Sequence, residues 1–233
     1  MLGRSSLQRS YAGEMLSLVR PMPLVLVPAV LDNPSLVWEV KYDGFRALAY
    51  VERGRCRLFS RTGHEFKRFP DVASALARAV GKRSAVLDGE IAVLGADGRS
   101  RFAPLMSGRG VARFCAFDLL WAGGRDLRGA GLLERKARLR ELVAWSNPRL
   151  LYVEHVEVHG PSFFEAACRM DLEGIVGKFA PGVYRCGGSE SSWLKVKNPT
   201  YSQMDGRHEL FETRREKSPL RRSPVVRPRL VLV

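Results

Sequence analysis

The stretch LVWEVKYDGFRALAYVE, residues 36–52, contains two apolar segments that a short polar insertion separates. The residues before Lys41 and after Arg46 are rich in aliphatic and aromatic side chains, which favour β-strands. Asp43 and Gly44 are depleted in strands and together indicate a turn. The stretch therefore predicts two strands joined by a turn, with a lysine at the end of the first strand.

The rest of the chain mixes further strands with helices. Apolar runs predict strands at 56–60, 84–94, 113–121, 150–159, 174–178 and 192–197. Helical spacing of apolar residues predicts helices at 71–80, 132–145 and 162–170, the first with Asp71 as its N-cap. Because strands and helices do not alternate regularly, we predict an α+β protein with antiparallel sheets flanked by helices.

The composition is strongly basic. The 233 residues carry a formal net charge of +14, and residues 207–233 contain eight Lys or Arg against three Glu, which leaves +9 in the body of the chain. This charge indicates a polyanionic partner, with nucleic acid favoured over an anionic membrane. The alternative is an arginine-rich composition spread over ordinary solvated surfaces. The hydrophobic fraction of 45% excludes a largely disordered chain.

The cysteines and the first apolar segment bear on the compartment. Cys56, Cys115, Cys168 and Cys186 form no CxxC pair, so neither a zinc site nor a disulfide scaffold is predicted. Residues 21–30 are apolar but contain three prolines and are too short to span a membrane. We predict a cytosolic protein without membrane contact.

Polar side chains lie at the ends of several predicted strands, where a scaffold holds them rigidly. Lys195 and Lys197 alternate on one strand, so they share a face with Trp193. Two lysines on one face indicate a phosphate group, and an edge strand protected from aggregation is the alternative. The other polar residues at strand ends are Lys41, Glu90, Asp118 and Glu173.

Glutamates together with several cations are typical of phosphoryl or nucleotidyl transfer. Carboxylates bind Mg²⁺ or Mn²⁺, and cations neutralise charge on phosphate oxygens. A lysine can serve as the nucleophile only as the neutral amine. Composition and spacing do not show which lysine has this role.

Six motifs occur in a fixed order along the chain, and together they are specific. They are EVKYDGFR at 39–46, SRTG at 60–63, LDGEI at 87–91, FCAFDLL at 114–120, EGIVGK at 173–178 and WLKVK at 193–197. The series resembles that of the covalent nucleotidyltransferases, which include DNA ligases, RNA ligases and capping enzymes. The residues within these motifs are most similar to those of the adenylation domain of bacterial ATP-dependent DNA ligases of the end-joining type.

This resemblance implies a fold and an activity. The fold is the ligase and capping-enzyme nucleotidyltransferase domain, an ATP-grasp-like α+β domain. Lys41 corresponds to the lysine that attacks the α-phosphate of ATP to form lysyl-AMP, and Asp43 and Gly44 shape its loop. AMP then passes to a DNA 5′-phosphate and the nick is sealed, in DNA repair or recombination. The implied cofactors are ATP and Mg²⁺ or Mn²⁺.

The resemblance also assigns roles to the other motif residues. Arg46 contacts the nucleotide and the 5′-phosphate at the nick, and Arg61 lies near both. Phe117 stacks on adenine, although a plain core position is the alternative, and Asp118 orders the loop rather than binding metal. The resemblance further implies that the backbone of Glu39 contacts adenine and that Glu90 lies near the ribose and the metal ion. Glu173 is expected near the metal ion, and Lys195 and Lys197 are expected to hold the α-phosphate.

The domain organisation departs from that of full-length ligases. We predict a loosely ordered segment at 1–20 with a short helix near 14–19, an adenylation domain at 21–211 and a basic tail at 212–233. The tail is expected to be disordered unless a nucleic acid or a partner orders it. The 36 residues after Lys197 are too few for an OB-fold barrel. The expected partners are nicked double-stranded DNA and a separate OB-fold or repair protein, in the bacterial cytosol near the nucleoid.

Two other functions remain open from the sequence. One is an RNA ligase or a capping-type nucleotidyltransferase, which has the same chemistry on another substrate. The other is a non-catalytic nucleic-acid-binding remnant, which the absent OB-fold and the arginine-rich tail favour.

Overall fold

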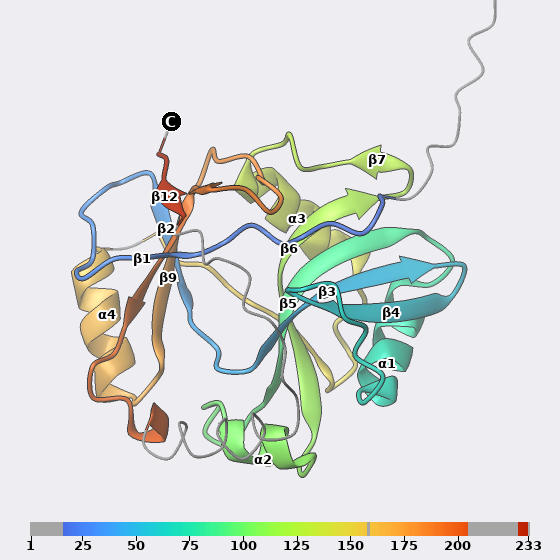
Figure 1. Ribbon diagram of the computed structural model, residues 1–233, viewed down its shortest axis with the longest axis horizontal. Coiled ribbons are helices and arrows are strands. Elements are labelled where there is room, and N and C mark those ends of the chain that lie inside the picture. Colours follow the sequence, from blue (N-terminus) through green and yellow to red (C-terminus); the bar gives the residue numbers. More distant parts are fainter. Residues whose placement is uncertain (1–15, 158, 205–227, 233) are drawn as a thin grey trace, which may run out of the picture.

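Two β-sheets packed face to face form the body of the protein (Figure 1). The computed structural model describes residues 16–157, 159–204 and 228–232 of the 233-residue chain. One sheet has four strands in the order β1 (Val25–Leu26), β11 (Trp193–Lys197), β9 (Gly174–Phe179) and β2 (Leu36–Val40). The other contains β4 (Arg55–Ser60), β3 (Phe45–Glu52), β5 (Ala85–Val93), β6 (Ala112–Ala122) and β7 (Arg125–Asp126), with β8 (Leu150–Tyr152) also paired to β6.

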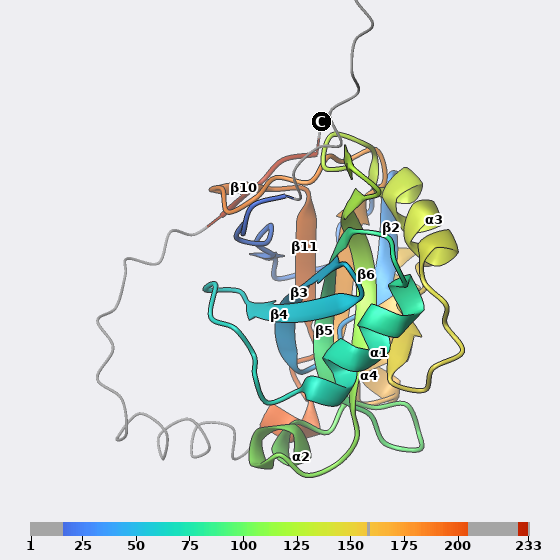
Figure 2. The same cartoon turned by 90° about the vertical axis from the view of Figure 1, so that its right-hand side faces the viewer.

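Helices surround the two sheets (Figures 1 and 2). The helix α1 (Pro70–Val80) covers the outer face of the six-stranded sheet, and α4 (Gly160–Arg169) packs on the outer face of the four-stranded sheet. The short helix α2 (Phe102–Ser107) lies at one end of the strands, and α3 (Leu132–Leu142) packs on β6 and reaches the interior between the sheets through Leu132. A 3₁₀ turn at Ser202–Met204 and a two-stranded pair, β10 (Glu190–Ser191) with β12 (Arg229–Leu230), complete the described elements. The predicted α+β class is confirmed.

Strand pairing is mostly antiparallel, as predicted. The pairs β3–β4, β3–β5, β5–β6, β9–β11 and β2–β9 are all antiparallel. Three pairs are parallel, namely β1–β11, β6–β8 and β10–β12, and each contains at least one strand of two or three residues. The longer strands therefore fix the architecture, and the short parallel strands extend its edges.

The polar stretch KYDG carries the chain from one sheet to the other. The strand β2 ends at Val40 in the four-stranded sheet, and β3 begins at Phe45 in the six-stranded sheet. Gly44 allows this crossing, because a Cβ atom there would lie 2.2 Å from the carbonyl oxygen of Ile91. The predicted change of direction is a bend at Gly44, and it places Lys41 at the boundary between the sheets.

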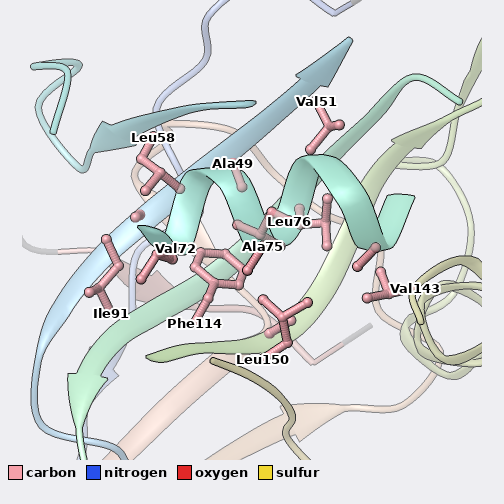
Figure 3. Close-up of a cluster of buried hydrophobic side chains, with 14 of the residues drawn as sticks. Ala49, Val51, Leu58, Val72, Ala75, Leu76, Ile91, Phe114, Val143 and Leu150 are labelled. Atoms are coloured by element: carbon pink, nitrogen blue, oxygen red, sulfur yellow. The ribbon is translucent and has the colours of Figure 1, made fainter. Parts of the chain in front are cut away.

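Alternation along the strands produces separate cores on the two faces of each sheet. Figure 3 shows α1 packed on the six-stranded sheet, with Val72 and Leu76 facing strand residues such as Ile91. Between the sheets, Val37 and Trp193 of one sheet meet side chains of the other. These partners in the six-stranded sheet include Leu48, Tyr50, Val86 and Leu120. The inward faces of both sheets therefore line a shared interior, and the polar inward residues lie at its edge.

Two local predictions are wrong. The N-cap of α1 is Phe69 and not Asp71, because Pro70, which needs no helical N–H partner, occupies the first turn. The strand predicted at 150–159 is limited to Leu150–Tyr152, since β6 pairs with only those three residues.

The termini are partly described. Residues 16–20 form no helix, so the helix predicted near 14–19 does not extend over its described part. Residues 1–15, 205–227 and 233, and with them most of the predicted tail, lie outside the described residues. The expectation of a disordered tail is wrong for residues 228–232. There Arg229 and Val231 donate backbone hydrogen bonds to Ser189 and Ser191, at 2.6 and 2.9 Å.

The described part of the chain contains no helix that is long and apolar enough to cross a membrane. All four cysteines are free thiols, and Cys115 is fully buried. Burial raises the pKa of the Cys56 thiol to about 12 and that of Cys115 further. The Cys56 and Cys115 thiols are therefore protonated at neutral pH and act as packing residues.

The substitution Gly44→Ala tests the crossing between the sheets. The new methyl group would overlap a backbone oxygen, so we expect a loss of about 1–3 kcal/mol in the free energy of unfolding. Gly129→Ala is the matched control, because no atom lies within 4 Å of a Cβ placed there. Urea denaturation of both variants measures the difference, and equal stabilities would contradict the close approach at Gly44.

Candidate active site

The four-stranded sheet presents rows of inward side chains. Register places Glu39 of β2, Val176 of β9 and Lys195 of β11 side by side. The next row contains Lys41, whose backbone N–H donates to the carbonyl oxygen of Gly174 at 3.0 Å, and Lys197 opposite Gly174. The sheet therefore gathers residues from three distant motifs on one surface.

The six-stranded sheet supplies the opposite surface. Arg46 of β3 lies in register with Glu90 of β5. Asp88 and Glu90 alternate along β5, so they share the inward face with Arg46. Phe117 of β6 completes this surface by packing edge-on against Trp193, with ring centroids 5.8 Å apart.

Two adjoining cavities open between these surfaces. The smaller, of about 40 Å³, is lined by Glu39, Val176, Lys178, Phe117 and Trp193, among others. The larger, of about 610 Å³, is lined by Arg61, Lys195, Phe45, Phe66 and the turn residues Ser60 and Thr62, and Pro228 also reaches it. Lys41, Arg46 and Glu90 line both cavities. An apolar recess with aromatic walls suits a nucleobase, and a wider basic cavity suits phosphates.

Lys41 lies where the two cavities meet. Its Nζ atom is 2.5 Å from Oε2 of Glu173, which directly precedes β9. The Lys41 side chain is 16% exposed and that of Glu173 is 5% exposed, so Lys41 lines the cavities while its partner is buried behind it. The amine is thus accessible to a molecule in either cavity and has a proton acceptor beside it.

Glu90 is the second carboxylate at this junction. Burial raises the pKa of its carboxyl to about 8, while the nearby Lys41 and Arg46 oppose the rise. An arriving cation would favour the ionised form. Among the described residues no group of three or more His, Cys, Asp or Glu side chains could hold a metal ion. Glu90 and Glu173 could therefore supply at most part of a coordination sphere.

Two of the three remaining predicted cations, Lys195 and Arg61, lie at the larger cavity. Lys195 lines it, and burial together with the charges of Lys41 and Lys197 lowers the pKa of the Lys195 amine. Arg61 follows β4 and is exposed at the rim. Lys197 shares the face of Lys195, as predicted, but is exposed and lines neither cavity.

Arg46 is already bound within the protein. Its Nε and Nη2 atoms donate to the two carboxylate oxygens of Asp88 at 3.0 and 2.6 Å. The guanidinium carbon lies 5.5 Å from the ring centre of Phe117 and 5.4 Å from that of Trp193. This side chain is therefore held rigidly at the junction of the two cavities.

Glu39 is part of a buried ionic cluster that the sequence did not reveal. Lys136 of α3 approaches one oxygen at 2.6 Å and Lys178 of β9 approaches the other at 2.6 Å. All three side chains are at most 2% exposed. Burial lowers the pKa of Lys178 to about 8, and Glu39 opposes this. The Lys178 amine also lies over the rings of Trp193 and Phe117, at 4.1 and 4.3 Å.

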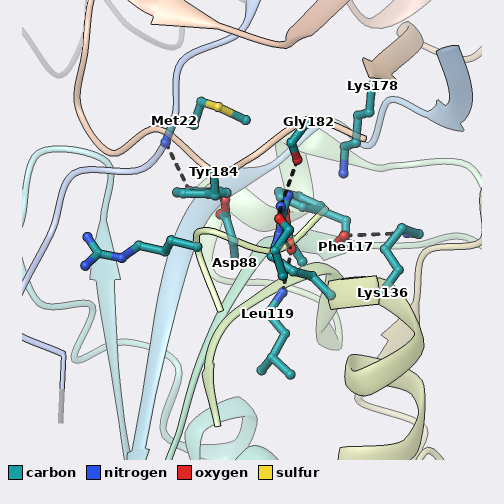
Figure 4. Close-up of polar contacts among 12 residues, drawn as sticks. Met22, Asp88, Phe117, Leu119, Lys136, Lys178, Gly182 and Tyr184 are labelled. Carbon is teal, nitrogen blue, oxygen red and sulfur yellow. Dashed lines mark hydrogen bonds and ion pairs between the residues drawn. The ribbon is translucent and has the colours of Figure 1, made fainter. Parts of the chain in front are cut away.

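Asp118 does not face the cavities. Both of its oxygens accept hydrogen bonds from Arg135 at 2.8 Å, and both side chains are fully buried. Arg135 also donates to the backbone oxygen of Gly182 at 2.9 Å, so the pair fixes the loop before Tyr184 (Figure 4). This agrees with the structural role predicted for Asp118.

The residues that the sequence missed carry a weak signal. Lys178 and Asp88 lie within the motifs EGIVGK and LDGEI but received no role, and strand alternation places them on the faces of Val176 and Glu90, respectively. Strand alternation alone would have brought both to the site. Lys136 and Tyr184 have no such signal, because neither belongs to a motif or to a strand that carries a predicted site residue.

Comparison with known proteins gives the family. Residues 27–197 match the model described as the ATP dependent DNA ligase domain. The multifunctional non-homologous end joining protein LigD of Pseudomonas aeruginosa is 34% identical over 190 residues, which cover 76% of this chain and 22% of that protein. The SPbeta prophage-derived DNA ligase-like protein LigB of Bacillus subtilis is 27% identical over 80% of this chain and 70% of its own.

Solved structures agree with the sequence matches. The ligase domain of Mycobacterium tuberculosis LigD superposes with a TM-score of 0.65 at 30% identity, over 76% of this chain and 60% of that one. A mycobacterial DNA ligase D complexed with ATP and MES superposes equally well, at 27% identity. The chain spans about a fifth of the Pseudomonas protein and three fifths of the mycobacterial domain.

Proposed function

Because the chain belongs to the ATP-dependent DNA ligase domain family, we propose that it is an adenylyltransferase that seals nicks in duplex DNA. The observation that carries this proposal is the position of Lys41. Its amine lies between a recess walled by Phe117 and Trp193 and a wider cavity lined by basic side chains. An adenine in the recess would extend its phosphates past this amine.

The first step joins AMP to the protein. Neutral Lys41 attacks the α-phosphorus of ATP, so that a P–N bond forms and the bond to the pyrophosphate oxygen breaks. The proton leaves the amine, and Glu173 is 2.5 Å away to accept it. Lys195 stabilises the negative charge that develops on the phosphate oxygens. The products are lysyl-AMP and pyrophosphate.

The next steps use the DNA ends. An oxygen of the 5′-phosphate attacks the phosphorus of lysyl-AMP, the P–N bond breaks, and Lys41 takes back a proton. We propose that Arg46 and Arg61, which line the larger cavity, hold the two phosphates. The 3′-hydroxyl then attacks the 5′-phosphate and loses its proton to water, a phosphodiester bond forms, and AMP leaves with the electrons of the broken P–O bond.

A divalent cation fits the residues present. We propose that Glu90 and Glu173 hold Mg²⁺ or Mn²⁺, with phosphate oxygens and water as the other ligands, as is usual for Mg²⁺ in such sites. When bound, the ion would supply positive charge that neutralises the phosphate oxygens. Glu173 contacts the Lys41 amine and Glu90 lines the same two cavities as Lys41, so both carboxylates suit this task.

The finer assignments are proposals as well. ATP is supported by the mycobacterial relative solved with ATP. A net charge of +14 supports a duplex DNA substrate. We also propose that the protein acts in the bacterial cytoplasm and that a separate OB-fold or repair protein assists it on the DNA.

A sealing assay tests this function. We expect ATP labelled at the α-phosphate to label the protein, and the label to move to a nicked DNA duplex and then to free AMP as the nick closes. Chelating divalent cations with EDTA should stop labelling, and added Mg²⁺ or Mn²⁺ should restore it. Closure of RNA nicks alone, or labelling by GTP in preference to ATP, would indicate the related RNA-directed enzymes. DNA binding without any labelling would indicate a non-catalytic protein.

A further inference from the structure

Tyr184, which lies outside the six motifs, is connected to Arg46 through a buried carboxylate. The hydroxyl of Tyr184 donates to Oδ2 of Asp88 at 2.6 Å, and this oxygen also accepts the bond from Arg46 Nη2. Asp88 is fully buried and Tyr184 is 4% exposed. The three side chains form one hydrogen-bonded chain from the loop before β10 to the wall of both cavities.

The Tyr184 ring is fixed on several sides (Figure 4). Its hydroxyl accepts a bond from the backbone N–H of Met22 at 3.0 Å, and its ring packs edge-on against Trp193 with centroids 5.5 Å apart. The guanidinium of Arg135 lies 5.7 Å from the ring centre. Burial and the charge of Asp88 raise the pKa of Tyr184 well above its usual value, so the hydroxyl keeps its proton and acts as a donor.

The Asp88 carboxylate in turn decides which edge of Arg46 remains available. A guanidinium has five N–H donors in a fixed plane. Asp88 takes one from Nε and one from Nη2, which leaves three at the other edge. Since Arg46 lines both cavities and the rings of Phe117 and Trp193 flank it, those donors are presented at the junction beside Lys41.

We propose that Tyr184, acting through Asp88, is a positioning residue that orients the free edge of Arg46 toward a phosphate beside Lys41. The proposal rests on the proposed ligase function. Without the hydroxyl, Asp88 has Arg46 as its remaining side-chain partner and can rotate with it. A displacement of about 1 Å in such a group can cost about 100-fold in rate.

Tyr50 provides a matched control within the same protein. It is 6% exposed, and its hydroxyl also accepts a bond from a backbone N–H, that of Val19 at 3.1 Å, and donates to an oxygen, that of Ser17 at 3.0 Å. Its partners belong to the N-terminal segment and not to the Arg46 chain. Tyr184→Phe and Tyr50→Phe therefore remove the same hydroxyl group from similar surroundings. Of these two hydroxyls, only that of Tyr184 is connected to Arg46.

The experiment measures the transfer of AMP from preformed lysyl-AMP protein to a nicked DNA duplex in a single turnover. We expect Tyr184→Phe to slow the transfer by roughly 10- to 100-fold, and Tyr50→Phe to change it less than about twofold. In the Arg46→Ala background, Tyr184→Phe should have little further effect, because the two residues act in one chain. The melting temperatures of the two Phe variants control for folding.

Three results separate the possible failures. Equal transfer rates for the two Phe variants would overturn the positioning role. So would a Tyr184→Phe effect that persists unchanged in the Arg46→Ala background, because that would show a general structural role. A wild-type protein that forms no lysyl-AMP would instead overturn the proposed function itself.

Discussion

Replacing Lys41 with alanine is expected to abolish covalent labelling of the protein by ATP that carries its label at the α-phosphate. Removing a covalent nucleophile lowers rates by roughly 10⁴-fold or more, because none of the remaining groups can form the intermediate. Glu173 would remain in place, but without the amine there is no proton for it to accept. Labelling is measured on denatured protein, where only a covalent bond survives.

The control for this substitution is Lys82→Ala, which removes an exposed lysine after α1 that lines neither active-site cavity. It should label like the wild type. Acid should release the label and alkali should not, as expected of a P–N bond to lysine. A labelled Lys41→Ala protein would assign the nucleophile to another residue, with Lys195 the first candidate because it lines the same cavity as Lys41. Sealing of a pre-adenylylated nick by the same variant would show that the rest of the site is intact.

Local patterns predicted the parts of the site that depend on one strand at a time. Alternation in WLKVK placed Trp193, Lys195 and Lys197 on one face, and the structure confirms it, with Leu194 and Val196 packed on the other side. The break at Asp43 and Gly44 predicted a turn. It did not predict that the turn joins two different sheets, because sheet membership depends on pairing with strands far along the chain.

Local sequence patterns could not predict the buried ionic clusters, for the same reason. Arg135 and Lys136 occur in a helix whose sequence looks like an ordinary amphipathic surface helix, yet both are buried. Their partners are 17 and 97 residues away, respectively, in β6 and β2. Burial of a charge becomes favourable only when tertiary structure brings its partner within hydrogen-bond distance. The family resemblance identified the motif residues but gave no information on these supporting contacts.

Glu39→Gln is expected to destabilise the protein by about 3–5 kcal/mol, because it leaves buried charges without a counterion. The cluster contains two lysines and one carboxylate, so it carries one positive charge in excess. Removing the carboxylate leaves two ammonium groups, each at most 2% exposed, with only a neutral amide between them. Urea denaturation at neutral pH measures this loss.

Lys178→Met is the matched substitution, since it removes one charge from the same cluster and conserves volume. It leaves Glu39 paired with Lys136 at 2.6 Å, a balanced pair that also keeps the bond from Lys136 to the carbonyl oxygen of Val153. We therefore expect a loss of less than about 1.5 kcal/mol, although the contacts of the amine with Trp193 and Phe117 disappear. Equal losses for the two variants would show that net charge does not govern this cluster.

The pH dependence distinguishes this electrostatic explanation from a simple packing defect. In Glu39→Gln the folded state depresses the lysine pKa values, so between those values and the ordinary lysine pKa the unfolded chain binds more protons. The stability of the variant must then rise with pH over that range, and its deficit relative to the wild type must shrink above neutrality. A packing defect would give a deficit that does not change with pH. In the wild-type protein, Lys178 of this positively charged cluster lines the recess. A hydrogen-bond acceptor on a bound base would therefore stabilise the excess positive charge of the cluster.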